Sequence, residues 1–317
     1  MKSSERTLVL RVTGFGGTNA IGHDGMTRFL VLLSLLILVL FLPCCEKKDK
    51  AETSGPGLVE KSVRSADGVP IAFSAQGEGS PALVFVHGWS CDRDYWKPQM
   101  EHFSKKHRVV AVDLAGHGKS GRGRDVWTME AFGADVRAVV NDQKLGRMIL
   151  IGHSMGGPVI VSAARGLSQD VLALVGADTF QDFVNEWPEE ERKLRQALQA
   201  DYAKNADAFV RSMFPESADP ALVDRVAADM SAAPPQVAVG AMEGLFDNDI
   251  QAALKGLDVP IYCINADFWP TNVEGNRQYA FSFDLSLMPG VGHFVMLEDP
   301  ARFNRLLEEV IGKVAAP

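Results

Sequence analysis

A serine set among glycines directly after an apolar run is the feature that most constrains this chain. The apolar residues 148–151 read Met-Ile-Leu-Ile, and Gly-His-Ser-Met-Gly-Gly follows at positions 152–157. The run predicts a buried strand, and the stretch from Pro158 predicts a helix, because proline is tolerated in a first helical turn. The outer glycines of the motif allow the strand and the helix to approach closely, so that the turn exposes Ser154. In this context the pattern G-x-S-x-G predicts a nucleophilic serine.

Three other segments place polar residues directly after an apolar run or before the last helix-like stretch. Residues 83–86 are apolar and lead into His-Gly-Trp at 87–89. Residues 109–112 are apolar and lead into Asp-Leu-Ala-Gly-His-Gly-Lys-Ser at 113–120. Near the C-terminus, Gly-His-Phe stands at 292–294. The pattern G-x-S-x-G alone could also be a plain glycine-rich turn, and these three segments decide between the two interpretations.

Together with the serine turn, these segments resemble the α/β-hydrolase superfamily, in its serine-nucleophile esterase and haloperoxidase-like branch. The resemblance covers roughly residues 58–314, with the motifs in the order of the family. It implies the α/β class, with a mainly parallel, doubly wound sheet and an inserted helical cap. The apolar runs agree with a buried parallel sheet, and the strand candidates lie at 82–86, 108–112, 147–151, 171–176, 260–264 and 283–288.

Two further patterns refine the organisation of the domain at 58–317. The dipeptide Asp67-Gly68 predicts the turn of an opening hairpin. The interval between residues 176 and 259 is too long for an ordinary crossover, and prolines and acidic residues in it predict helix starts. By resemblance, this interval is a helical cap at about 180–256. The alternative is a surface insertion without a role at the site.

The predicted nucleophile needs a base, because a serine hydroxyl attacks only as its proton is removed. His293 is the candidate, since an imidazole takes up and returns a proton near neutral pH. The acid that orients it has two candidates. Asp267 follows the run at 261–264 and gives the Ser-Asp-His order of the family, so we favour it. Asp178 follows the preceding strand, and some family members carry the acid at that point.

Two backbone N–H groups are expected to receive the oxyanion. One belongs to Met155, directly after the nucleophile, and by resemblance the other belongs to Trp89. His87 is expected to organise this loop rather than to transfer protons. Apolar residues near the expected site predict a hydrophobic pocket, although each could equally be ordinary core; the candidates are Phe180, Trp187, Phe268, Trp269 and Phe294.

These residues predict acyl transfer to water, with carboxylic esters as the leading substrates. The alternatives on the same residues are hydrolysis of a carbon–carbon bond or a lactone, and perhydrolysis. A non-catalytic ligand-binding or signalling module of the same fold is a further alternative. The seven histidines show no paired spacing typical of metal ligands, so we expect no metal and no other cofactor.

The N-terminus predicts export. An uncharged apolar run at 29–42 follows Arg28, and its length suits the core of a signal peptide better than a membrane span. Cys45 is the expected lipidated residue of a bacterial lipoprotein, with Cys44 as the alternative. Met26 would begin a compact signal peptide, so we expect translation to start there. Residues 1–45 are then an extension and signal, and 46–57 a flexible linker.

Charge and composition limit the partners. The net charge is −8, and no basic stripe accompanies it, which argues against nucleic acid. The expected partners are a small hydrophobic acyl substrate, water, and a membrane reached through the lipid anchor, at the periplasmic side or the cell surface. An uncleaved N-terminal anchor is the alternative. The sequence leaves the oligomeric state open.

Overall fold

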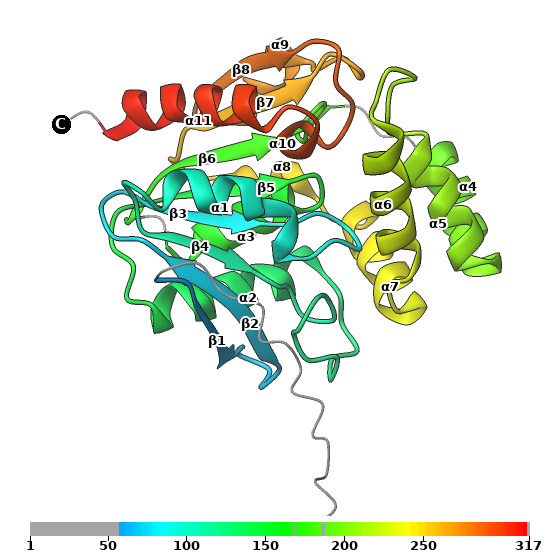
Figure 1. Ribbon diagram of the computed structural model, residues 1–317, viewed down its shortest axis with the longest axis horizontal. Helices are drawn as coiled ribbons and strands as arrows, with labels where there is room; N and C mark the ends of the chain where they lie inside the picture. The colour runs from blue at the N-terminus through cyan, green and yellow to red at the C-terminus, as the bar shows by residue number, and fades with distance from the viewer. Residues whose placement is uncertain (1–56, 168, 185–187, 316–317) are drawn as a thin grey trace, which may run out of the picture. The chain divides into compact units, whose positions relative to one another are not determined.

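One twisted sheet forms the centre of the computed structural model, which describes residues 57–167, 169–184 and 188–315 (Figure 1). The sheet has eight strands in the order β1-β2-β4-β3-β5-β6-β7-β8. The strands are β1 (Val59–Arg64), β2 (Pro70–Gln76), β3 (Ala82–Val86), β4 (Val109–Val112), β5 (Met148–His153), β6 (Val171–Ala177), β7 (Ile261–Ala266) and β8 (Phe283–Met288). The predicted signal peptide, Cys45 and residues 46–56 of the predicted linker lie outside the described residues.

The sheet is antiparallel at one edge and parallel elsewhere. The strands β1 and β2 form the predicted hairpin around Gly68, whose φ of 87° suits a residue without a side chain. From β4 to β8 every pair is parallel. All residues of β3, β4 and β5 are buried, as expected of strands covered on both faces. The predicted fold class is therefore confirmed.

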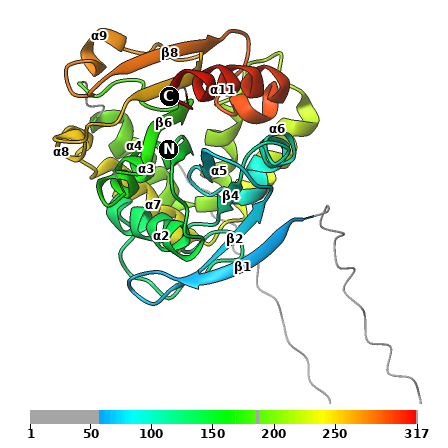
Figure 2. The same cartoon turned by 90° about the vertical axis from the view of Figure 1, so that its left-hand side faces the viewer.

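Helices cover both faces of the sheet, with α11 on one side and α2 and α3 on the other (Figure 2). Phe303, Leu307 and Ile311 of α11 are buried at helical spacing, so one stripe of this helix packs on the sheet. The helices are η1 (Arg93–Trp96), α1 (Lys97–Phe103), α2 (Met129–Asp142), α3 (Gly156–Arg165), α4 (Pro188–Ala200), α5 (Tyr202–Arg211), α6 (Pro220–Ser231), α7 (Pro235–Phe246), α8 (Ile250–Leu254), α9 (Val273–Asn276), α10 (Val295–Glu298) and α11 (Pro300–Ala315).

The helices α4 to α8 lie between β6 and β7 in the chain, in the span where the sequence predicts the cap. Of these, α4 to α7 stand together beside one end of the sheet (Figure 1). Side chains cap two of them, since Asp201 accepts from the N–H of Lys204 and Asp219 from that of Ala221. Among the described residues, no helix has the length and apolar character needed to cross a membrane.

The close approach of β5 and α3 depends on Gly152. A Cβ at this position would lie 2.3 Å from the carbonyl oxygen of Gly156, and backbone atoms cannot give way as a flexible side chain can. We predict that Gly152→Ala lowers the free energy of unfolding by about 3 kcal/mol, measured by urea denaturation.

Gly146 provides the matched control. A Cβ there would meet nothing within 4 Å, so Gly146→Ala should change stability by no more than about 0.5 kcal/mol. Equal effects of the two substitutions would contradict the steric role of Gly152.

Candidate active site

Ser154 occupies a sharp turn between β5 and α3. Its φ is 51°, a left-handed conformation that costs a residue with a side chain about 1–3 kcal/mol. The turn is held by two hydrogen bonds, from the Ser154 N–H to Ala177 at 3.2 Å and from the Gly157 N–H to the Ser154 carbonyl at 2.8 Å. A Cβ on Gly156 would lie 2.6 Å from the Val86 carbonyl, which explains the second glycine. The strained turn lifts the hydroxyl away from the sheet.

His293 lies in the loop after β8 and meets a carboxylate from a distant strand end. Its Nδ1 donates a hydrogen bond of 2.6 Å to Oδ2 of Asp178. Asp178 directly follows β6, and its side chain is 1% exposed. Its other oxygen accepts a hydrogen bond of 2.8 Å from the N–H of Ala266, at the end of β7. The carboxylate is thus held on both sides, and it orients the imidazole.

The assignment of Asp267 as the acid is therefore wrong. Asp267 is exposed, and its Oδ1 accepts from the N–H of Gly290 at 3.1 Å. Because β7 continues to Ala266, the end of this strand presents a backbone N–H to Asp178, while Asp267 turns toward the loop after β8. The alternative acid of the sequence analysis, Asp178, occupies the place beside His293.

Groups on either side of His293 hold its backbone. The carboxylate of Glu298 accepts from the N–H of Gly292 at 2.9 Å and from that of Phe294 at 3.1 Å. Nε2 of His153 donates to the His293 carbonyl at 3.0 Å, and burial keeps the pKa of His153 well below its ordinary value. Sequence reasoning missed Glu298, although an acid one turn after a loop histidine could have suggested it.

The two expected oxyanion donors flank the nucleophile. In the described part of the chain, the N–H groups of Trp89 and Met155 have no acceptor outside their own turns. The loop that carries Trp89 lies directly against the serine, because a Cβ on Gly88 would be 3.1 Å from Cβ of Ser154. Both N–H groups therefore have no such acceptor among the described residues, as is required of groups that receive an oxyanion.

His87 organises the loop after β3. Its Nε2 accepts from the N–H of Leu114 at 3.0 Å, and its Nδ1 donates to the Gly88 carbonyl at 2.8 Å. Burial lowers the pKa of His87 to about 4. The neutral ring thus joins the loop after β3 to the loop after β4.

An apolar cavity of about 210 Å³ opens beside Ser154 and His293. Trp269 and Phe294 line it, as the sequence predicted. Phe180 instead packs on Phe183, and Phe268 packs on Trp269. Trp187 lies outside the described residues. Much of the lining comes from the helices of the cap, at residues that the sequence did not predict; these are Leu194, Phe209, Met230, Met242, Leu245 and Phe246.

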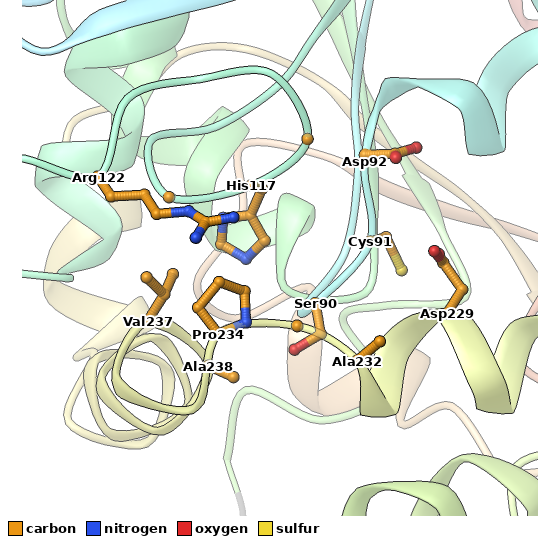
Figure 3. Close-up of a pocket in the computed structure, with 13 residues that line it drawn as sticks. Ser90, Cys91, Asp92, His117, Arg122, Asp229, Ala232, Pro234, Val237 and Ala238 are labelled. Atoms are coloured by element: carbon orange, nitrogen blue, oxygen red, sulfur yellow. The ribbon is translucent and has the colours of Figure 1, made fainter. Parts of the chain in front are cut away.

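A second, more polar cavity of about 200 Å³ lies on the other side of the loop that follows Trp89 (Figure 3). Ser90, Cys91 and Asp92 form one wall, and the ends of α6 and α7 contribute the opposite one. The figure shows His117 and Arg122 reaching in from the loop after β4. Cys91 lines both cavities, so this loop borders each of them.

The burial of His87 predicts a pH-dependent stability. In the unfolded chain this histidine protonates near 6.5, but in the folded protein only near 4, so the unfolded state binds more protons between these values. Stability is therefore lost as the pH falls through this window. We predict that His87→Gln, which removes the titrating group, loses about 2 kcal/mol less than wild type between pH 7 and pH 5. Urea denaturation at both pH values measures this, and equal losses would contradict it.

The contacts of the two aspartates predict opposite outcomes for Asp178→Asn and Asp267→Asn. An amide at 178 can no longer hold the imidazole in the required tautomer, so turnover of a p-nitrophenyl ester should fall about 10⁴-fold. Asp267→Asn should change it less than about threefold, because that side chain only contacts Gly290. A larger loss in Asp267→Asn, with both variants folded by circular dichroism, would refute this assignment.

Comparisons with known proteins agree with this geometry. A model of the Alpha/beta hydrolase family matches residues 83–306. The chain is 39% identical over 113 residues to the bifunctional esterase/perhydrolase DCH of Acinetobacter calcoaceticus, covering 35% of this chain and 41% of that protein. It is 32% identical over 121 residues to the dihydrolipoyllysine-residue acetyltransferase component of the acetoin cleaving system of Cupriavidus necator. This match covers 38% of this chain and 32% of that protein.

The chain thus spans less than half the length of these two relatives. Among solved structures, an esterase from Thermogutta terrifontis superposes with a TM-score of 0.70 at 25% identity, over 81% of this chain and 100% of that one. The match to the family model spans well over half of the chain and includes the serine turn, the acid and the histidine. The chain belongs to the alpha/beta hydrolase family.

Proposed function

We propose that this protein is a serine hydrolase that cleaves carboxylic esters through an acyl-enzyme. The observation that carries the proposal is the placing of Ser154 and the Asp178-paired His293 on the wall of one apolar cavity. Two backbone N–H groups beside the serine complete the set of groups that acyl transfer requires.

The reaction follows from the position of each group. Nε2 of His293 takes the hydroxyl proton of Ser154 as the serine oxygen attacks the carbonyl carbon. The carbonyl oxygen becomes an oxyanion between the N–H groups of Trp89 and Met155. The carbon–oxygen bond to the alcohol then breaks, and His293 returns the proton to the departing oxygen. Water, deprotonated by His293, attacks the acyl-enzyme and releases the acid and the free serine.

Asp178 contributes without exchanging protons. Its buried carboxylate accepts from Nδ1 of His293, so the Nε2 lone pair faces the site, and the imidazolium that forms in the reaction is stabilised. The N–H of Ala266 donates to the other carboxylate oxygen, which fixes the orientation of the carboxylate toward the imidazole.

The cavity suggests the acyl group. Its lining is almost entirely aliphatic, aromatic and thioether side chains, which favours an uncharged hydrocarbon chain. A cavity of about 150 Å³ accepts a benzene molecule, so a space of about 210 Å³ accommodates a group of roughly six to eight carbon atoms. We therefore expect esters of short and medium acyl chains to be preferred.

Other reactions use the same groups. Lactones, carbon–carbon bonds of diketone type and perhydrolysis remain alternatives, and the name of the Acinetobacter calcoaceticus relative pairs esterase with perhydrolase. A non-catalytic binding or signalling module also remains, since an intact set of residues does not itself demonstrate turnover.

We further propose that the chain is an exported lipoprotein held to a membrane through Cys45. The apolar run at 29–42 and the cysteines after it support this proposal. These residues lie outside the described part of the chain. Mass spectrometry of the native protein tests the proposal, because a diacylglyceryl group on residue 45 is expected, and an unmodified peptide spanning residues 40–50 would exclude it.

A fluorophosphonate probe and a series of p-nitrophenyl esters test the hydrolase proposal. The wild type should be labelled, and turnover should peak at roughly six to eight acyl carbons, as the cavity volume predicts. Ser154→Ala should abolish labelling and lower turnover at least about 10⁴-fold.

The matched control is Ser162→Ala, which removes a buried hydroxyl from the middle of α3 that bonds to Glu130 rather than facing the cavity. It should be labelled like the wild type. Absence of labelling in wild-type protein would favour the binding module instead.

A further inference from the structure

The oxyanion loop, residues 88–92, has open space on both of its faces. Trp89 and Cys91 line the apolar cavity, and Ser90, Cys91 and Asp92 line the polar one (Figure 3). The side chains of Trp89, Ser90 and Cys91 are nevertheless buried. The contacts that these side chains make with the cap therefore contribute to the position of the loop.

The loop also contains strained backbone. Ser90 has a φ of 54°, in the left-handed region that residues with a side chain rarely adopt. Such a conformation costs about 1–3 kcal/mol and persists only when its surroundings hold it. A strained residue depends on the groups that hold it, so the loss of one of these groups would allow the loop to shift. Because Trp89 directly precedes Ser90, such a shift would move the N–H that receives the oxyanion.

Hydrogen bonds connect this loop to helices of the cap. Oη of Tyr202, on α5, lies 2.6 Å from the carbonyl oxygen of Met230, on α6. A carbonyl only accepts, so the tyrosine hydroxyl donates there. The Ser90 hydroxyl, 3.0 Å from the same Oη, must then be the donor to it. One phenol oxygen thus joins two cap helices to the strained residue.

Tyr202 also touches the oxyanion residue itself. Its ring packs edge-on against that of Trp89, with the ring centroids 6.0 Å apart. Trp89 is tied to the cap a second time, because its Nε1 donates to the Ala238 carbonyl, on α7, at 2.7 Å. Beyond the loop, in η1, the hydroxyl of Tyr95 donates to Asp229 of α6 at 2.7 Å.

We propose that Tyr202 is a positioning residue for the oxyanion donor at Trp89, acting through the hydroxyl of Ser90. This inference rests on the proposed hydrolase function. Tyr202 contacts no reacting atom; it holds the loop so that the Trp89 N–H lies where the oxyanion forms. Its loss should weaken binding of the transition state and leave binding of the substrate ground state nearly unchanged.

Tyr202→Phe is the direct test, since it keeps the ring contact with Trp89 and deletes only the hydroxyl. We expect kcat on the best p-nitrophenyl ester to fall about tenfold, less than the loss of a whole oxyanion donor, with KM within about twofold. Affinity for a trifluoromethyl ketone with the same acyl chain, which forms an oxyanion adduct, should fall in proportion. Affinity for the product carboxylate should not change.

Ser90→Ala separates positioning from damage to the cap. It breaks the tie to the loop and leaves the bond between Tyr202 and Met230 intact. If that tie carries the effect, each single variant and the double variant lose kcat to a similar extent. Tyr262→Phe is the control, because this half-buried tyrosine lies at the start of β7, at the opposite end of that strand from Ala266, and should behave as wild type.

The outcomes are distinct. Unchanged kcat in both Tyr202→Phe and Ser90→Ala, in an enzyme that is labelled and hydrolyses esters, would overturn this inference alone. Equal losses of affinity for the ketone and for the carboxylate, together with a lowered melting temperature, would assign Tyr202 a purely structural role and also overturn it. An unlabelled, inactive wild type would contradict the proposed function and this inference with it.

Discussion

A single buried carboxylate connects the segments that make up the site. Asp178 directly follows β6, receives the N–H at the end of β7, and holds the imidazole from the loop after β8. Removing an ionised group of this kind from water is costly unless hydrogen bonds compensate, and here both oxygens are engaged. The register of the last three strands therefore determines whether the histidine can act. The sheet brings together residues that are far apart in the chain, and the carboxylate fixes their orientation.

Two histidines, His87 and His117, form hydrogen bonds in the loops after β3 and β4, and both are neutral. Burial lowers the pKa of His87 to about 4 and that of His117 to about 3. Each ring therefore stays uncharged near neutral pH and serves as a rigid hydrogen-bonding element, as His87 does between the two loops that it joins. The charged pair at the turn after β4 is different, because Asp113 accepts from both the backbone and the guanidinium of Arg93.

Much of this arrangement could be predicted from the sequence, and the limit of prediction has a physical cause. The strands and the serine turn follow from local patterns, because apolar runs and glycine spacing report directly on backbone geometry. His293 and Trp89 are instead predicted from the order of the motifs and the resemblance to the family. The choice between Asp178 and Asp267 does not, since both follow strands and only the direction of each side chain distinguishes them. The same holds for the cavity, whose lining from the cap depends on how α4 to α7 pack together.

The cap is one continuous segment of the chain between β6 and β7. Ser154, Asp178 and His293 all lie outside the inserted helices, so an exchange of those helices for another set would preserve these three residues and the hydrogen bond between Asp178 and His293. It would not preserve Tyr202, which belongs to α5 and reaches back to Ser90. Replacing the cap to change substrate selectivity would therefore also displace the Trp89 N–H that receives the oxyanion. A tyrosine at the corresponding position of the new cap would prevent this.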